Sequence, residues 1–311
     1  MLFISDPVIG DGHGTHVTSI ITGYQLGSLL INGVAPGVTI IPVLVLDTWT
    51  IPNYGPEGDN VTIGSDRMVA KGINYITGLK MTELRESPVI ISMSLGGPDP
   101  SPLIEEAIDN AIDHGVIVVA AAGNAGEDGM DWPGAYPEVI SVAAGGWTME
   151  FIFGGFWLSD VPEKLNTPDI LGNNWQTYLA FFSSRPNKDL GQSWKHLDVC
   201  APGSAVVGPF TEDGMENFDY YYLWGTSQAT PHVSGIAALI LQSYPSLDQG
   251  DVEHIVKHAS RKLPIPADGA TIFWPFIGDI GDFIFLKWNN HDAGSGFLQA
   301  DNAMKSAAKF A

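Results

Sequence analysis

Four short apolar runs constrain the fold of this chain more than any other feature. They are residues 39–46, 89–95, 116–122 and 139–144. Each run is too short for a helix and too continuous for a strand with one exposed face. Such runs are typical of strands that are covered on both faces, as in parallel sheets. The sequence therefore predicts a buried, mainly parallel sheet.

Helical patterns lie between and after these runs, with apolar residues recurring every three or four positions. One of these helices has Ser101 as its expected N-cap, Pro102 at its first position and Gly115 at its end. The alternation of strands and helices predicts an α/β fold, a doubly wound sheet with helices on both faces. The expected helices cover residues 69–76, 102–115, 248–259 and two segments that start near 14 and 227.

Domain organisation is predicted to be simple, because no linker divides the 311 residues. The whole range 1–311 is expected to form a single domain. Two stretches, 147–179 and 264–290, break the alternating pattern and are predicted to be irregular insertions on the surface.

Charge and composition exclude several classes of protein. The chain has 35 Asp and Glu against 14 Lys and Arg, a formal charge of −21. Nucleic acid and anionic membranes are therefore poor partners, because binding phosphate needs basic surface. A single cysteine excludes an internal disulfide and a cysteine-rich zinc site. No transmembrane segment is expected, since no apolar run reaches 18 residues, and the first residues do not resemble a signal peptide.

Three polar segments place reactive groups where helices or strands begin or end: residues 11–17, 121–124 and 225–232. His13 precedes one expected helix, Ser227 starts another, and Asn124 follows a buried strand. A serine hydroxyl is a weak nucleophile that needs a neighbouring base, and His13 is suited to that role. The amide of Asn124 and the backbone N–H of Ser227 are suited to stabilise an oxyanion. Together these groups predict an acyl-transfer site.

These segments resemble the motifs of the subtilisin-like serine proteases (subtilases, peptidase family S8). The matching motifs are His-Gly-Thr-His-Val at 13–17, Gly-Asn at 123–124 and Gly-Thr-Ser-x-Ala-x-Pro-His-Val at 225–233. Residues 94–97, 198–203 and 294–300 resemble further landmarks of the family. Three motifs in the family's order make the resemblance specific, and it covers most of the chain.

The resemblance implies a serine endopeptidase with His13 as general base, Ser227 as nucleophile and Asn124 as oxyanion donor. It also implies protein or peptide substrates, a secreted location, and no cofactor for the chemistry. Calcium is implied by the family alone, with no spacing in this chain to specify a site. The residues expected to bind substrate by this resemblance are Ser94, Leu95, Gly96, Ala121, Ala122 and Gly123.

One departure from the family pattern concerns the third catalytic residue, an Asp at the end of the first core strand. Only twelve residues precede His13, too few for the usual spacing. The chain is therefore expected to be truncated at its N-terminus and to lack that first strand. The alternative is a diverged form in which Asp6 takes the role. Without the Asp, which orients the imidazole, this chain is expected to be weakly active or inactive.

Asp131 carries a separate hypothesis, because residues 131–134 resemble the family loop at the floor of the primary specificity pocket. A carboxylate there would favour Arg or Lys before the cleaved bond. The alternative is a solvated loop carboxylate. His13 and His16 are not predicted to bind metal, since no further ligands cluster with them. His16 and His232 are expected to be structural.

A rival function from another class stays open at this point. The chain could be a noncatalytic pseudoprotease that binds extended peptides along residues 94–96, or a structural protein with the same fold. The retained His13, Asn124 and Ser227 favour the enzyme. The sequence does not indicate the oligomeric state or the natural substrate.

Overall fold

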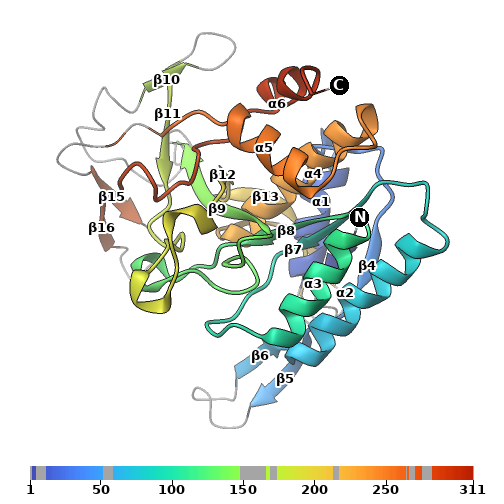
Figure 1. Ribbon diagram of the computed structural model, residues 1–311. Coiled ribbons are helices and arrows are strands. Elements are labelled where there is room, and N and C mark those ends of the chain that lie inside the picture. The colour runs from blue at the N-terminus through green and yellow to red at the C-terminus, as the bar shows by residue number, and fades with distance from the viewer. Residues whose placement is uncertain are drawn as a thin grey trace.

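The computed structural model describes residues 2–4, 12–51, 59–147, 166–168, 174–212, 217–263, 265, 270–274 and 282–310. Within these residues, a large sheet runs through the middle of the molecule, with helices on both of its faces (Figure 1). This arrangement confirms the predicted α/β class with a mainly parallel sheet.

The large sheet has the strand order β10-β11-β9-β8-β7-β1-β4, and β12 also pairs with β9. Strands β4, β1, β7, β8, β9 and β12 pair in parallel, whereas β11 and β10 are antiparallel additions next to β9. The four predicted apolar runs correspond to β4, β7, β8 and β9. The bounds are β1 Leu2–Ile4, β4 Ile41–Val43, β7 Val89–Met93, β8 Val116–Ala121, β9 Ile140–Trp147, β10 Asn166–Pro168, β11 Asn174–Leu179 and β12 Val199–Pro202.

Strand β1 corrects the expectation that the sheet lacks a first strand. Leu2 is paired with Ile41 of β4 on one side and with Ile91 of β7 on the other. A gap at this place would leave the facing edges of β4 and β7 without hydrogen-bond partners. Three residues are enough to bridge the two strands over their short paired length. The prediction failed because it relied on the family's usual spacing before His13, which excluded a strand so close to that residue.

Two apolar cores lie on opposite faces of the sheet, because successive side chains of a strand point to opposite sides. Ile90 of β7 belongs to the core that α1, α4, α5 and α6 cover, whereas Val89 and Ile91 belong to the core under α2 and α3. Figure 1 shows α2 and α3 together on their side of the sheet. The helices are α1 His13–Thr22, α2 Asp66–Met81, α3 Pro102–Asp113, α4 Thr226–Ser243, α5 Gln249–Ala259 and α6 Ala300–Ala307.

The stretches predicted to be irregular insertions, 147–179 and 264–290, contain strands in their described parts. Within the first, β11 pairs with the end of β9 and so extends the large sheet. The polar sequence of β11 does not show the pattern of a strand. The segment becomes a strand because it pairs with β9, which is distant in the sequence. The remaining strands form four hairpins: β2 Gly23–Leu26 with β3 Leu29–Asn32, β5 Asp47–Ile51 with β6 Asp59–Ile63, β13 Val206–Glu212 with β14 Asn217–Leu223, and β15 Ala270–Trp274 with β16 Asp282–Leu286.

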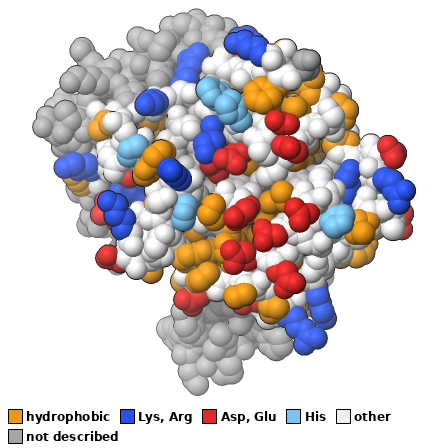
Figure 2. Space-filling model, in the orientation of Figure 1, with side chains coloured by type: hydrophobic (Ala, Val, Ile, Leu, Met, Phe, Trp, Pro, Cys, Tyr) orange, Lys and Arg blue, Asp and Glu red, His pale blue; other side chains and the backbone are white. Residues whose placement is uncertain are grey.

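The surface reflects the acidic composition. In Figure 2 a group of Asp and Glu side chains occupies the middle of the visible face. Among the described residues, no helix is long and apolar enough to cross a membrane.

Candidate active site

Ser227 is the second residue of α4, the most deeply buried helix of its core. The helix begins directly after Gly225, whose backbone is extended. Val233 and Ile240 of this helix lie seven residues apart, so they share one face, and both are fully buried against the sheet. The position in the first turn leaves the backbone N–H of Ser227 without an acceptor inside the helix, and the helix dipole favours negative charge there. The side chain itself is partly exposed.

Ser94 connects the nucleophile candidate to the end of β7. The Ser227 hydroxyl donates to the carbonyl oxygen of Ser94 at 3.3 Å, and the Ser94 hydroxyl donates to the carbonyl oxygen of Ser227 at 2.7 Å. This reciprocal pair fixes residues 94–96, the expected substrate-binding segment, beside Ser227. The site thus lies at the carboxyl ends of parallel strands, where α/β sheets bind ligands.

Asn124 follows β8 and is held by the residue that precedes the nucleophile. Its Oδ1 accepts hydrogen bonds from the backbone N–H of Thr226 at 2.9 Å and from the Thr226 hydroxyl at 3.1 Å. The backbone N–H fixes the orientation of the amide, because only the oxygen can accept from it. The Nδ2 group is therefore turned away from Thr226, and the exposed side chain can present it to a ligand.

His13 is the first residue of α1 and is half-buried. Helix α1 packs against α4, with Val17 and Val233 in one shared core. His13 and His232 of α4 both lie close enough to His16 to act on it electrostatically, so the start of α1 lies near the second turn of α4. Helix packing therefore brings His13 to the side of the molecule that carries Ser227.

His16 and His232 have the structural environment that was predicted for them. Burial lowers the pKa of each to about 4, so both are neutral at pH 7. Nε2 of His16 lies 3.0 Å from the carbonyl oxygen of Val206, and Nδ1 of His232 lies 2.9 Å from that of Gln228. A carbonyl oxygen can only accept, so these ring nitrogens carry the protons. The bond of His16 joins α1 to the start of β13, whereas the bond of His232 lies within α4.

Asp6, the candidate for the third catalytic residue, lies outside the described residues. Its role stays a prediction. Among the described residues, no three His, Cys, Asp or Glu side chains are grouped so that they could hold a metal ion. The calcium that the family resemblance implies therefore stays a prediction.

The expected pocket residues, 121–123, and the expected substrate strand, 94–96, are joined by the segment that contains Asp131. The backbone N–H of Asp131 donates to the carbonyl oxygen of Ala122 at 2.8 Å. The next residue, Trp132, exchanges two backbone hydrogen bonds with Gly97, at 2.8 and 2.9 Å. The structure thus places Asp131 between the two segments.

Two polar residues of this region were not assigned a role from the sequence. The Thr226 hydroxyl accepts from the backbone N–H of Gly123 at 3.2 Å while it donates to Asn124. The Ser184 hydroxyl accepts from the backbone N–H of Ala125 at 2.9 Å. Thr226 lies inside a recognised motif, so its position was visible in the sequence. Ser184 follows one of the stretches set aside as irregular and carried no signal.

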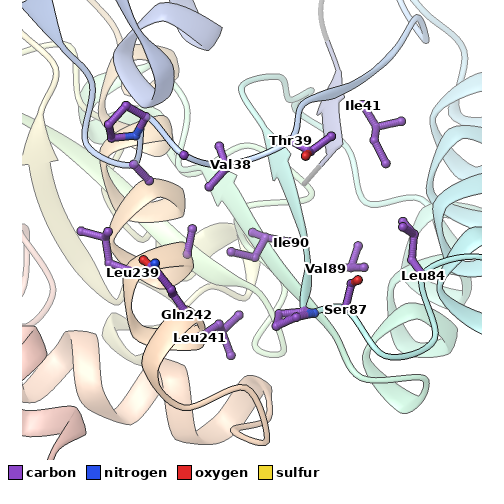
Figure 3. Close-up of a pocket in the computed structure, with 15 residues that line it drawn as sticks. Val38, Thr39, Ile41, Leu84, Ser87, Val89, Ile90, Leu239, Leu241 and Gln242 are labelled. Carbon is purple, nitrogen blue, oxygen red and sulfur yellow. The ribbon is translucent and has the colours of Figure 1, made fainter.

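An apolar groove of about 550 Å³ lies at the opposite end of β7 (Figure 3). Val89 and Ile90, at the start of that strand, line it together with Leu239 and Leu241 of α4. Ser94 and Ser227 lie beyond the other end of β7, so this groove is separate from the candidate active site.

Comparison with known proteins agrees with this geometry. A sequence model of the Subtilase family matches residues 5–273. The chain belongs to the subtilase family. This subtilase is 30% identical to subtilisin DY of Bacillus licheniformis over 258 residues, 82% of this chain and 72% of subtilisin DY. It is 29% identical to fervidolysin of Fervidobacterium pennivorans over 303 residues, which are 97% of this chain.

Among solved structures, sphericase resembles this subtilase with a TM-score of 0.62 at 28% identity, over 93% of this chain and 77% of sphericase. The family and fold class predicted from the motifs are therefore confirmed. The chain spans 35% of the length of fervidolysin and 51% of that of the M-protease of Shouchella clausii.

Proposed function

We propose that this subtilase is a serine endopeptidase that hydrolyses peptide bonds through an acyl-enzyme on Ser227. The observation that carries the proposal is the hydrogen bonding of Asn124 to Thr226, which holds a side-chain amide at the start of the helix that bears Ser227. The relatives named as a subtilisin and as M-protease support a protease. Protein or peptide substrates and a secreted location belong to the same proposal.

The proposed reaction begins with attack of the Ser227 hydroxyl oxygen on the carbonyl carbon of the scissile bond. His13 takes the hydroxyl proton as that bond forms. The oxygen of the tetrahedral intermediate becomes negative and accepts hydrogen bonds from Asn124 Nδ2 and from the backbone N–H of Ser227. His13 then gives its proton to the leaving amine, and the C–N bond breaks.

The acyl-enzyme is hydrolysed by the same groups. His13 takes a proton from water, and the hydroxide oxygen attacks the ester carbonyl carbon. The second tetrahedral intermediate accepts hydrogen bonds from the same two donors. When it breaks down, the C–O bond to Ser227 breaks and His13 returns the proton to the Ser227 oxygen. A carboxylate that orients His13 would stabilise the imidazolium in both steps, and Asp6 is the candidate for that role.

Labelling with a fluorophosphonate probe tests the proposal, because the probe phosphonylates only an activated serine. We expect labelling of the purified chain that is lost in Ser227→Ala, together with hydrolysis of peptide amide substrates. A folded chain that binds peptides yet neither reacts with the probe nor hydrolyses them would overturn the proposal in favour of the noncatalytic peptide binder. The same labelling and hydrolysis measurements on Asp6→Asn show whether that carboxylate assists His13.

A further inference from the structure

Helix α5 carries two neighbouring imidazoles on its exposed side. His254 and His258 are both exposed and lie four positions apart, so their side chains share one face of the helix. Their ring centroids are 4.2 Å apart, with the ring planes tilted by 39°. The opposite face of α5, which carries Val252 and Val256, is buried in the core. The pair therefore faces the solvent from a helix that the core holds in place.

The two rings have no polar partner in the part of the chain that the structure describes: neither takes part in a hydrogen bond or an ion pair there. Phe310 contacts His254 at a centroid distance of 5.1 Å, and its ring offers no ligand atom. The ammonium group of Lys257 is paired with Asp198 at 2.8 Å and with Glu253 at 2.9 Å. The lone pair of each neutral imidazole is therefore available to an external ligand.

The chemistry of the pair favours a transition-metal ion. Neutral imidazole is the commonest metal ligand and suits Zn²⁺, Cu²⁺ and Ni²⁺, whereas Ca²⁺ and Mg²⁺ take oxygen ligands. Bonds of roughly 2.0–2.1 Å place two nitrogens of one Zn²⁺ ion about 3–3.5 Å apart, which two rings with centroids 4.2 Å apart can supply. A protonated pair would attract an anion instead, but the formal charge of −21 disfavours anion binding.

We infer that His254 and His258 chelate one Zn²⁺, Cu²⁺ or Ni²⁺ ion on the surface of α5, with water in the remaining coordination positions. Within the described ranges, no third His, Cys, Asp or Glu side chain joins the pair. The site is therefore more open than a structural zinc site, which has four protein ligands. The folded helix holds both imidazoles together and the unfolded chain does not, so the ion stabilises the folded state. The inference does not depend on the proposed peptidase function.

Isothermal titration calorimetry of the metal-free chain with ZnCl₂ at neutral pH tests this inference. Loss of an outer-shell partner alone weakens metal binding by about tenfold or more, so His254→Gln and His258→Gln, which each remove a ligand, should raise Kd by at least that factor. Glutamine is a good helix former, so both variants should fold. His114→Gln is the matched control, because His114 is exposed at the end of α3 and its Nδ1 lies 2.7 Å from the carbonyl oxygen of Asn110. It should keep the wild-type Kd.

Thermal unfolding gives a second readout. Saturating Zn²⁺ should raise Tm of the wild type and of His114→Gln more than that of either pair variant, and CaCl₂ should not distinguish the four proteins. A wild-type Kd for Zn²⁺ above about 1 mM, or equal Kd values in the wild type and both pair variants, would overturn the inference. A raised Kd in only one pair variant would also overturn it, since a single imidazole does not chelate.

Discussion

Thr226 shows how a residue beside the nucleophile can position a group that acts on the substrate. Its backbone N–H and its hydroxyl both donate to Oδ1 of Asn124, and its hydroxyl also accepts from the backbone N–H of Gly123. The buried Thr226 side chain therefore connects the segment that follows β8 to the start of α4. The orientation of the Asn124 amide depends on this connection.

Thr226→Val, which removes the hydroxyl and keeps the shape, should lower kcat by about tenfold with little change in KM. Asn124 would keep the backbone hydrogen bond but lose the second one, so its Nδ2 group would be held less firmly toward the oxyanion. Steady-state kinetics with a peptide amide give the two constants separately. Thr226→Ser restores the hydroxyl and should recover kcat; a serine variant as slow as the valine variant would contradict the positioning role.

His16 makes the fold sensitive to acid. Its Nε2–H is bonded to Val206, whereas its Nδ1 has no hydrogen-bond partner among the described residues. Burial, which disfavours the charged imidazole, lowers the pKa of His16 from 6.5 to about 4. Because the unfolded chain takes up the proton first, the stability that neutral His16 provides is complete above pH 6.5 and is lost as pH falls toward 4.

Between pH 7 and pH 5, this single group should lower the free energy of unfolding by about 2 kcal/mol. Urea denaturation at the two pH values measures the change. His16→Gln keeps a donor for Val206 but does not titrate, so its loss of stability between pH 7 and pH 5 should be smaller by that amount. Exposed His114→Gln is the control and should behave as the wild type; equal losses in all three proteins would refute the prediction.

At the scale of elements, Asp198 joins β9, α5 and the segment before β12. Oδ2 accepts from the backbone N–H of Ser141 at 2.8 Å, and Oδ1 is paired with Nζ of Lys257 at 2.8 Å. The residue is 2% exposed. Burial raises the pKa of Asp198 to about 6, although Lys257 acts in the opposite direction. The ion pair is therefore what makes an ionised Asp198 tolerable in the core at neutral pH.

Lys257→Met should lower the free energy of unfolding by about 3 kcal/mol at pH 8, because it leaves a buried carboxylate without its counter-charge. The raised pKa means that the folded state binds the proton more readily, so stability is lost as pH rises through 6. At pH 5, where Asp198 is largely protonated, the cost of Lys257→Met should be much smaller.

Urea unfolding at pH 5 and pH 8 measures this difference. Lys305→Met removes the same charge from an exposed pair with Asp301 at 2.7 Å and should cost about 0.5 kcal/mol or less at either pH. A pH-independent cost for Lys257→Met would contradict the role assigned to Asp198.

The sequence predicted those elements whose own pattern forms them. The run 116–122 correctly predicted β8, whose six residues are all buried, whereas the run 39–46 gave β4, which ends the sheet and is only partly buried. Strands β1 and β11 were missed, since pairing with segments far away in the chain, rather than local pattern, makes them strands. Motifs likewise indicated Ser227 and Asn124, whereas the hydrogen bond from the backbone N–H of Ala125 to Ser184 depends on packing between segments far apart in the chain.

For the whole molecule, the parallel sheet explains why segments more than a hundred residues apart meet. Strands β7 and β8 end at the same edge, and α4 starts there, so Ser94, Asn124 and Ser227 lie together. Residues after a strand are free of the sheet's hydrogen bonds and can face a ligand. The apolar groove lies at the opposite ends of the strands and is therefore separate from the candidate active site.

The net charge of −21 predicts a dependence of stability on salt. Repulsion among the excess carboxylates opposes the compact state, and raising NaCl from about 0.01 M to about 1 M shortens the Debye length from roughly 30 Å to roughly 3 Å. The midpoint of thermal unfolding at pH 7 should therefore rise with salt, as differential scanning calorimetry can measure. At pH 5, where the net negative charge of the chain is smaller, the rise should be smaller. A rise of the same size at both pH values would assign the effect to salting-out of apolar surface instead of charge screening.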